Sequence, residues 1–374
     1  MTRRAIVILG VVAIAFSGFI VVRLLAAHDL NPTTTIKFGE VFPDQNRYAE
    51  GLLGEIVVAP MAGHDGKYFF VQAVDPFYLE PNVHALHLDR PSYRAQRMAY
   101  PTLASLGGLL PPRATAWGLI IVNLMGMVVG TIYTGFVADR MGLSWLFGIA
   151  FLLNPGLLVD LMIDGAGVLA MAGLMAGIYY MLDDRIWPAA AALSVSALAR
   201  ETMLIAVFGL GAFLLYRKRK LEYRLSLPLA AVAVWWLYVH RRLDEGLSQD
   251  TQALGLPFVG FARAFQGWLA TPGNTIDLVI ACALLVTSIV LVIRSVRTPT
   301  ALGWAVSGFA VLGTMLSEPV WRSWFDSSRA LAPVLTAFIL LAAAPSSDRL
   351  VPGPGTTVAI ANCHVGQAGR VPPR

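Results

Sequence analysis

Long apolar runs alternate with short polar stretches along most of the chain, and the lengths of these runs predict its elements. A helix that spans a bilayer needs about 20 mainly apolar residues, and the uncharged run 5–22 approaches that length. The further runs predicted to span are 114–138, 142–159, 165–182, 225–239, 278–293, 301–317 and 330–344. The pattern predicts an all-α, polytopic helical bundle with about 9–10 crossings.

The run 186–216 is too long for one crossing, because such a helix would extend about 46 Å at 1.5 Å per residue. Arg200 and Glu201 interrupt this run, and the basic cluster Arg217-Lys218-Arg219-Lys220 follows it. Basic residues favour the cytoplasmic side, so we expect a hairpin of two half-length helices that meet at Arg200. Asn154-Pro155-Gly156 predicts a break in another span, because proline removes a helix donor.

Residues 26–100 form the one long polar excursion, and we expect it to be an extracytoplasmic first loop. Its short apolar pieces, 52–61 and 68–74, suit helices that lie along the membrane interface. Arg3 and Arg4 place the N-terminus in the cytoplasm; a signal peptide cleaved after residue 27 is the alternative. The expected domains are a membrane-embedded domain, 1–344, and a disordered cytoplasmic tail, 345–374.

Composition narrows the class of protein. Hydrophobic residues make up 56% of the chain and charged residues only 14%, whereas soluble domains carry about 25% charged residues. A multi-pass protein of the cell (plasma) membrane, in contact with lipids, is therefore expected. The net charge of +5 does not indicate nucleic-acid binding, because the basic residues fall largely at the ends of apolar runs.

The candidate for chemistry in the first loop is Asp65, in the stretch Gly63-His64-Asp65-Gly66-Lys67-Tyr68. Two glycines leave the backbone free to turn there, and the aromatic residues that follow favour the border of water and hydrocarbon. A plain turn followed by an interfacial anchor is the alternative. His64 alone does not complete a divalent-metal shell, so no metal or other cofactor is expected, although a divalent ion stays possible.

Other charged residues gather on the same predicted side of the membrane. Placing a charged side chain near the hydrocarbon core costs a few kcal/mol, so each of these residues is expected to have an ion-pair partner or a function. Arg200 and Arg329 suit phosphate, which a guanidinium grips through two donors; structural ion pairs and interfacial anchors are the alternatives. The residues on this side are Asp65, Lys67, Arg97, Arg200, Glu201, Glu318, Arg322, Asp326 and Arg329.

Four short stretches follow one another along the chain in a recognisable order. They are Asp65-Gly66-Lys67-Tyr68, Arg97-Met98-Ala99-Tyr100-Pro101, Ala197-Leu198-Ala199-Arg200-Glu201-Thr202 and Ser328-Arg329-Ala330-Leu331-Ala332-Pro333. These stretches resemble segments of the polytopic GT-C class of membrane glycosyltransferases, in particular bacterial relatives of PIG-V-like and of mannosyl- or arabinofuranosyltransferase-like proteins. His64 stands where those proteins usually have tryptophan, and Glu201 replaces a proline.

The resemblance implies transfer of a sugar, with inversion, from a polyprenyl-phosphate donor to an extracytoplasmic glycan, lipid or protein acceptor. Asp65 would be the catalytic base. The residues expected to contact substrate or phosphate are Arg97, Arg200, Arg329, Lys67 and Tyr68, with support from His64, Glu201 and Glu318. Two other functions stay open: a transporter or lipid-carrier flippase with Arg200-Glu201 in the substrate path, and a non-catalytic scaffold whose first loop binds a partner.

Overall fold

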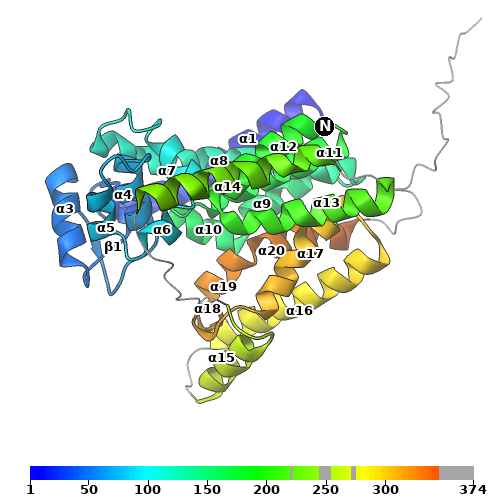
Figure 1. Ribbon diagram of the computed structural model, residues 1–374. Helices are drawn as coiled ribbons and strands as arrows, with labels where there is room; N and C mark the ends of the chain where they lie inside the picture. Colours follow the sequence, from blue (N-terminus) through cyan, green and yellow to red (C-terminus); the bar gives the residue numbers. More distant parts are fainter. Residues whose placement is uncertain (220–221, 244–253, 271–274, 345–374) are drawn as a thin grey trace, which may run out of the picture. The chain divides into compact units, whose positions relative to one another are not determined.

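The computed structural model describes residues 1–219, 222–243, 254–270 and 275–344. The predicted disordered tail, 345–374, lies outside them. Helices form nearly all of the regular structure in the described residues (Figure 1). The exception is a parallel pair of two-residue strands, β1 (Phe38–Gly39) and β2 (Val58–Ala59). The all-α fold class is therefore confirmed apart from this pair.

Three helices within the described residues are long and apolar enough to cross a membrane. They are α1 (Arg3–Ala26), α8 (Pro112–Arg140) and α16 (Thr275–Arg297). Two bent pairs raise the number to five if each pair is one span: Trp145–Leu152 with α10 (Pro155–Met162), and α19 (Trp324–Ala330) with α20 (Ala332–Ala343). Three shorter apolar helices are α11 (Gly167–Leu182), α12 (Ile186–Ala199) and α17 (Ala301–Thr314). These lengths are below the roughly 20 residues of a full crossing, so ten crossings exceed what length and composition support.

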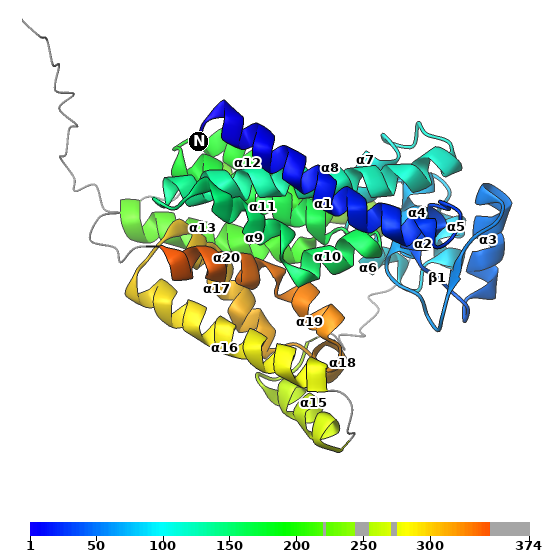
Figure 2. The same cartoon turned by 180° about the vertical axis from the view of Figure 1, so that it is seen from behind.

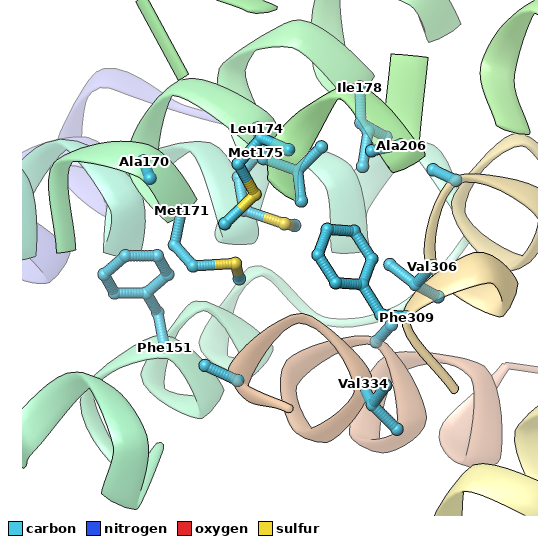
Figure 3. Close-up of a cluster of buried hydrophobic side chains, with 14 of the residues drawn as sticks. Phe151, Ala170, Met171, Leu174, Met175, Ile178, Ala206, Val306, Phe309 and Val334 are labelled. Carbon is cyan, nitrogen blue, oxygen red and sulfur yellow. The ribbon is translucent and has the colours of Figure 1, made fainter. Parts of the chain in front are cut away.

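The long helices share one apolar core. Helix α11 packs against α8 and α12, α1 runs beside α8, and α17 contacts α13 (Leu204–Lys218), α16 and α20 (Figures 1 and 2). Figure 3 shows the centre of this core, where Met171 and Met175 of α11 lie near Phe151 and Phe309. Flexible methionine side chains fill the irregular space between helices. The remaining elements of this region are η1 (Trp145–Gly148), α9 (Ile149–Leu152), η2 (Glu201–Met203), η3 (Tyr223–Leu225), α14 (Ser226–Arg242), α15 (Val259–Ala270) and α18 (Glu318–Arg322).

The chain reverses direction at Arg200, as the hairpin prediction requires. Helix α12 ends at Ala199, Arg200 has an extended backbone, and α13 begins at Leu204. Lys218, the last residue of α13, pairs with Asp184 just before α12 begins, with 2.8 Å between Nζ and Oδ1. The far end of α13 has therefore returned to the start of α12, and Arg200 lies at the tip.

Helix ends meet in two separate groups of charges. At one end the amine of Met1 pairs with Asp139, and Arg140 pairs with Asp183 beside the Lys218–Asp184 pair. Helices α11, α12 and α13 run from there to the opposite end, where the residues around Asp160 and Arg200 lie. The second group contains the candidate site.

The predicted first loop folds into short elements packed on the helical core. They are α2 (Thr33–Ile36), β1, α3 (Pro43–Leu53), β2, α4 (Gly66–Val74), α5 (Pro81–His87), α6 (Pro91–Arg94) and α7 (Ala99–Ala104). The predicted interfacial helix 52–61 is wrong, because α3 ends at Leu53 and residues 58–59 form β2. The second piece is helical, as α4, but Phe69 and Phe70 are buried in protein rather than placed at the lipid interface.

Two breaks shape the helices near the site. Asn154 caps α10 through its Oδ1, which accepts from the backbone of Gly156, while its Nδ2 donates to the carbonyl of Ala332 at 2.8 Å. The predicted break at Asn154-Pro155-Gly156 is therefore present, with a 52° bend. The predicted last span, 330–344, matches α20 within two residues, and α20 follows α19, which ends at Ala330, after a 65° bend. Pro333 in the first turn of α20 favours that restart.

Candidate functional site

The turn that carries Asp65 is fixed by close backbone contacts on both sides. Asp65 is the N-cap residue of α4. Gly63 has φ of +63°, which favours glycine, and a β-carbon on Gly66 would lie 2.6 Å from the carbonyl oxygen of Ile163 and 2.7 Å from that of Ile36. The backbone N–H of His64 donates to the carbonyl of Lys37 at 3.1 Å. The glycines therefore serve close packing as well as turning.

Each carboxylate oxygen of Asp65 accepts from a different arginine. Arg94 in α6 donates from Nη1 to Oδ1 at 2.9 Å, and Arg329 in α19 donates from Nη2 to Oδ2 at 2.8 Å. The Asp65 side chain is 22% exposed, and the side chains of Arg94 and Arg329 are less exposed than that. Asp65 thus lies half-buried between two cations from separate parts of the chain.

Arg329 also pairs with a second carboxylate, that of Asp160. Its Nε donates to Oδ1 of Asp160 at 2.7 Å, and Asp160 is almost fully buried in the last turn of α10. A β-carbon on Gly167 would lie 1.9 Å from Asp160 Oδ2, so α11 must begin with a small residue here. The Arg200 guanidinium donates from Nη1 to the backbone carbonyl of Arg329 at 3.0 Å. The hairpin tip is thereby fastened to α19.

Arg94 is positioned by the first loop alone. Its Nε and Nη2 donate to the two carboxylate oxygens of Asp89 at 2.9 and 3.0 Å, the bidentate geometry that a planar guanidinium favours. Its central carbon lies 4.1 Å from the centre of the Tyr68 ring. Tyr68 follows Asp65 by one helical turn, so α4 supplies both the acid and the surface under its arginine.

A second ion pair lies beside these groups. Arg97 donates from Nε and Nη2 to the two carboxylate oxygens of Glu201 at 3.0 and 3.1 Å, and Nη2 also donates to the Tyr93 hydroxyl at 2.7 Å. This pair joins the end of the first loop to the hairpin tip. We refer to the whole set as the Asp65 cluster, consisting of Asp65, Arg94, Arg97, Asp160, Arg200, Glu201 and Arg329.

The charges of the cluster control the ionisation of Asp65. Burial by itself would raise the pKa of Asp65, but the guanidinium groups of Arg329 and Arg94, and more weakly Arg97, hold it far below its usual value. Asp65 is therefore ionised throughout the physiological range. The same opposing effects, burial against the neighbouring Arg94, leave the pKa of Asp89 below its usual value.

Arg200 differs from the other three arginines of the cluster. Arg94, Arg97 and Arg329 each pair with at least one carboxylate. Within the described part of the chain, Arg200 forms no ion pair, and its one hydrogen bond from the guanidinium goes to a neutral carbonyl. A guanidinium with remaining donors and no anionic partner is suited to bind an anion.

The structure brings together only some of the residues predicted for the site. Asp65, Arg97, Arg200, Glu201 and Arg329 are in the cluster, and Tyr68 supports Arg94. His64 lies close enough to Arg329 and Asp65 for their charges to affect it, while burial lowers its pKa. Glu318 pairs instead with Arg322 at 2.7 Å, outside the cluster.

Lys67 has a structural environment that its sequence context does not reveal. It is 1% exposed, its ammonium donates to the carbonyl of Ala62, and it lies 3.5 Å from the centre of the Phe42 ring. Burial lowers its pKa to about 8. This placement does not support the predicted contact of Lys67 with phosphate.

Arg94 and Asp160 are the site residues that the sequence did not single out. Arg94 precedes Arg97 by three residues, so the sequence holds two arginines close together at the end of the first loop. Asp160 lies in an otherwise apolar run, where a carboxylate is costly without a partner. Those two signals were present, but neither identifies Asp65 or Arg329 as the partner.

A buried carboxylate lies behind the Asp65 turn. Asp164 is fully buried, with φ of +49°, and its Oδ2 accepts from the Thr35 hydroxyl at 2.7 Å. Burial raises its pKa to about 7. Nearby, Asn123 donates to the Tyr100 hydroxyl at 2.9 Å. Asp164 follows Ile163, one of the two residues whose carbonyls enclose Gly66, so this network supports the Asp65 turn from behind.

Fold and site together define a helical protein with helices of membrane-spanning length and a cluster of paired charges where its helix ends meet. No protein-family model, curated protein or solved structure matches the chain. Among the described residues, no group of three or more histidine, cysteine, aspartate or glutamate side chains is arranged to hold a metal ion.

Proposed function

We propose that this protein is a membrane glycosyltransferase similar to the GT-C class, which transfers a sugar from a polyprenyl-phosphate donor to an extracytoplasmic acceptor. One observation carries the proposal: an ionised aspartate lies between Arg94 and Arg329, next to Arg200, which forms no ion pair with any described residue. A carboxylate that accepts a proton and a cation that receives a leaving phosphate are the two groups such a transfer needs.

The proposed topology places the Asp65 cluster at the extracytoplasmic face. The opposite helix ends carry the basic residues Arg140, Lys218 and Arg294, and basic ends favour the cytoplasm. Both termini are then cytoplasmic. The ten predicted crossings belong to this proposal, with α11, α12, α13, α14 and α17 as crossings shorter than the usual span and α10 and α20 as parts of bent pairs.

In the proposed reaction, Asp65 accepts the proton of an acceptor hydroxyl as that oxygen attacks the anomeric carbon of the donor. The new carbon–oxygen bond forms as the bond from the anomeric carbon to the phosphate oxygen breaks, with inversion. The electron pair of the broken bond leaves on the phosphate, which already carries negative charge and needs no strong acid. Arg200 stabilises the negative charge on the leaving phosphate, and Arg329 lies next to Arg200.

Asp65 is a weak base while both arginines pair with it, because its pKa is so low. A bound phosphate competes for the same guanidinium donors and would weaken one of these pairs. The donor would thereby raise the basicity of Asp65 at the moment when a base is needed. This order of events gives the two arginine pairs of Asp65 a function: without bound donor, Asp65 is too weak a base and the site is inactive.

The location of the cluster supports an enzyme over a transporter. Asp65, Arg94, Arg97, Arg200 and Glu201 lie in loops, in short elements or at helix ends. The other two cluster residues, Asp160 and Arg329, belong to the two bent helix pairs, where they lie in the last turn of α10 and of α19. Transporters place their substrate sites near the bilayer midplane, within discontinuous spans. The cluster occupies one end of α11, α12 and α13, where a lipid-linked phosphate and a water-soluble acceptor can meet.

The test is sugar transfer by membranes that contain the full chain, with tritiated polyprenyl-phosphate mannose, arabinofuranose and glucose as separate donors. Wild-type protein is expected to move label from the donor to an extractable lipid, glycan or protein product. Asp65→Asn, which keeps the shape of the side chain, is expected to lower transfer by about 10³-fold or more. Equal product from the Asn variant and wild type, at equal membrane levels, would reject the base assignment.

A further inference from the structure

A small pocket opens on the first loop, close to the Asp65 cluster. It lies between the start of α3, Tyr68 of α4 and the residues that end α5 (elements labelled in Figure 1), and its volume is ≈ 250 Å³. Pockets for drug-sized ligands are larger, at about 300–1,000 Å³, so this one suits a single ring-sized group. The lining residues used below are Phe42, Asp44, Gln45, Tyr68, His87 and Asp89.

The pocket wall and the cluster share residues. Tyr68 and Asp89 line the pocket, and both contact the Arg94 guanidinium. The same guanidinium donates to Asp65 at 2.9 Å. The Arg94 side chain therefore lies between the pocket and Asp65, the proposed base. A ring bound in the pocket would lie next to a hydroxyl that Asp65 activates.

The lining offers an anion no free cation. Asp44 and Asp89 line the pocket, but each already pairs with an arginine, Asp44 with Arg47 at 2.7 Å and Asp89 with Arg94 at 2.9 Å. No lysine or arginine is among the lining residues. An anionic group would therefore find no counter-ion in this pocket, which favours an uncharged group.

The remaining lining suits a group that carries hydroxyls. Aromatic rings of Phe42 and Tyr68 offer flat apolar surface. Burial and the carboxylate of Asp89 raise the pKa of Tyr68 well above its usual value, so its hydroxyl stays protonated. Gln45 is 5% exposed and donates to the carbonyl of His87 at 2.8 Å, while its own Oε1 has no partner among the described residues. A ligand hydroxyl that reached this buried oxygen would satisfy it.

We propose that this pocket binds a neutral sugar ring of the acceptor, the unit next to the hydroxyl that receives the new sugar. The proposal rests on the proposed transferase function and adds the acceptor class: a glycan or glycolipid with an uncharged ring at that position. Aromatic rings, and a lining with no free cation to pair with a carboxylate, favour neutral polyols over sugar acids.

The test measures binding without catalysis. Purified full-length protein in detergent is titrated with methyl β-glucoside, methyl β-galactoside and methyl α-mannoside, and bound ring protons are followed by saturation-transfer NMR. At least one neutral methyl glycoside is expected to bind, and methyl glucuronide at least about tenfold more weakly. Equal binding of the glucuronide, or stronger binding of methyl glucosaminide than of any neutral glycoside, would overturn the proposal.

Two tryptophan variants localise the binding. Leu86 lines the rim and is 78% exposed, so Leu86→Trp is expected to fill the pocket and weaken glycoside binding at least about tenfold. Leu79 is 65% exposed and outside the pocket, so Leu79→Trp is the matched control and is expected to bind as wild type. Unchanged binding by Leu86→Trp would place the sugar elsewhere and contradict the proposal.

The Asp65→Asn variant separates the two proposals, because it is expected to bind the glycoside while transferring no sugar. Sugar transfer that survives Asp65→Asn would refute the proposed function and leave the pocket result intact. Glycoside binding that is unchanged in Leu86→Trp would refute the proposed sugar site in the pocket and leave the role of Asp65 intact.

Discussion

Asp65 Oδ2 and Arg329 Nη2 lie 2.8 Å apart although 264 residues separate them in the chain. Arg329 also donates to Asp160, so one guanidinium joins the first-loop turn to the end of α10. A planar guanidinium serves two carboxylates at once, which the single ammonium of lysine does less well. This relationship makes Arg329 both a structural and a proposed functional residue.

Substitution of Arg329 is expected to separate these two roles. Arg329→Lys keeps a cation between the acids, so we expect a small loss of thermal stability but a loss of sugar transfer of about 10²-fold or more. Arg329→Ala leaves the buried Asp160 without its ion-pair partner, although Asp65 keeps Arg94, and is expected to cost about 3–5 kcal/mol of stability. Melting in detergent and transfer in membranes measure the two effects. A lysine variant with wild-type transfer would show that Arg329 only supports the fold.

Arg200 and Arg97 form a matched pair for testing the anion site. Arg200→Ala removes a hydrogen bond to a carbonyl and is expected to cost about 1 kcal/mol of stability. Arg97→Ala leaves Glu201 without its partner and is expected to cost about 3–5 kcal/mol. If Arg200 binds the donor phosphate, its variant loses transfer while remaining folded. Normal transfer by a well-folded Arg200→Ala protein would remove the phosphate assignment.

Stability is expected to depend on pH through Asp164. Its pKa is raised to about 7 in the folded state, above the value of about 3.9 in an unfolded chain. The folded state then binds more protons, so stability falls as pH rises from about 4 to about 7 and levels off above that. We expect Asp164→Asn to flatten this part of the profile of melting temperature against pH. An unchanged slope in the variant would assign the pH dependence to another group.

Two glycine substitutions are expected to act in opposite directions. A β-carbon on Gly66 would meet two backbone carbonyls, so Gly66→Ala should displace the Asp65 turn and lower both transfer and melting temperature. Gly51, inside α3, has nothing within 4 Å of such a carbon. Gly51→Ala should therefore stabilise the protein by about 0.5–1 kcal/mol, as alanine does in helices. Equal tolerance at both positions would contradict the close packing around Gly66.

Apolar run lengths along the chain determined the helical class and most helix positions. The interruption at Arg200-Glu201 predicted the hairpin, and Asn154-Pro155-Gly156 predicted the break before α10. Such features are local: a proline or a charged pair changes the cost of continuing a helix in lipid wherever the rest of the chain lies. The sequence also indicated Asp65, because an acid between two glycines is a local pattern.

Tertiary structure alone decided which charges meet. Lys67 and Glu318 carry the right charges but contact Ala62 and Arg322. Arg94 and Asp160 became site residues only because α6, α10 and α19 converge on one turn. Ion pairing depends on distances of a few ångströms between remote segments, and local residue patterns do not encode those distances. Arg329 lies one residue before the end of α19, at the 65° bend to α20, and reaches Asp65 across 264 residues of sequence.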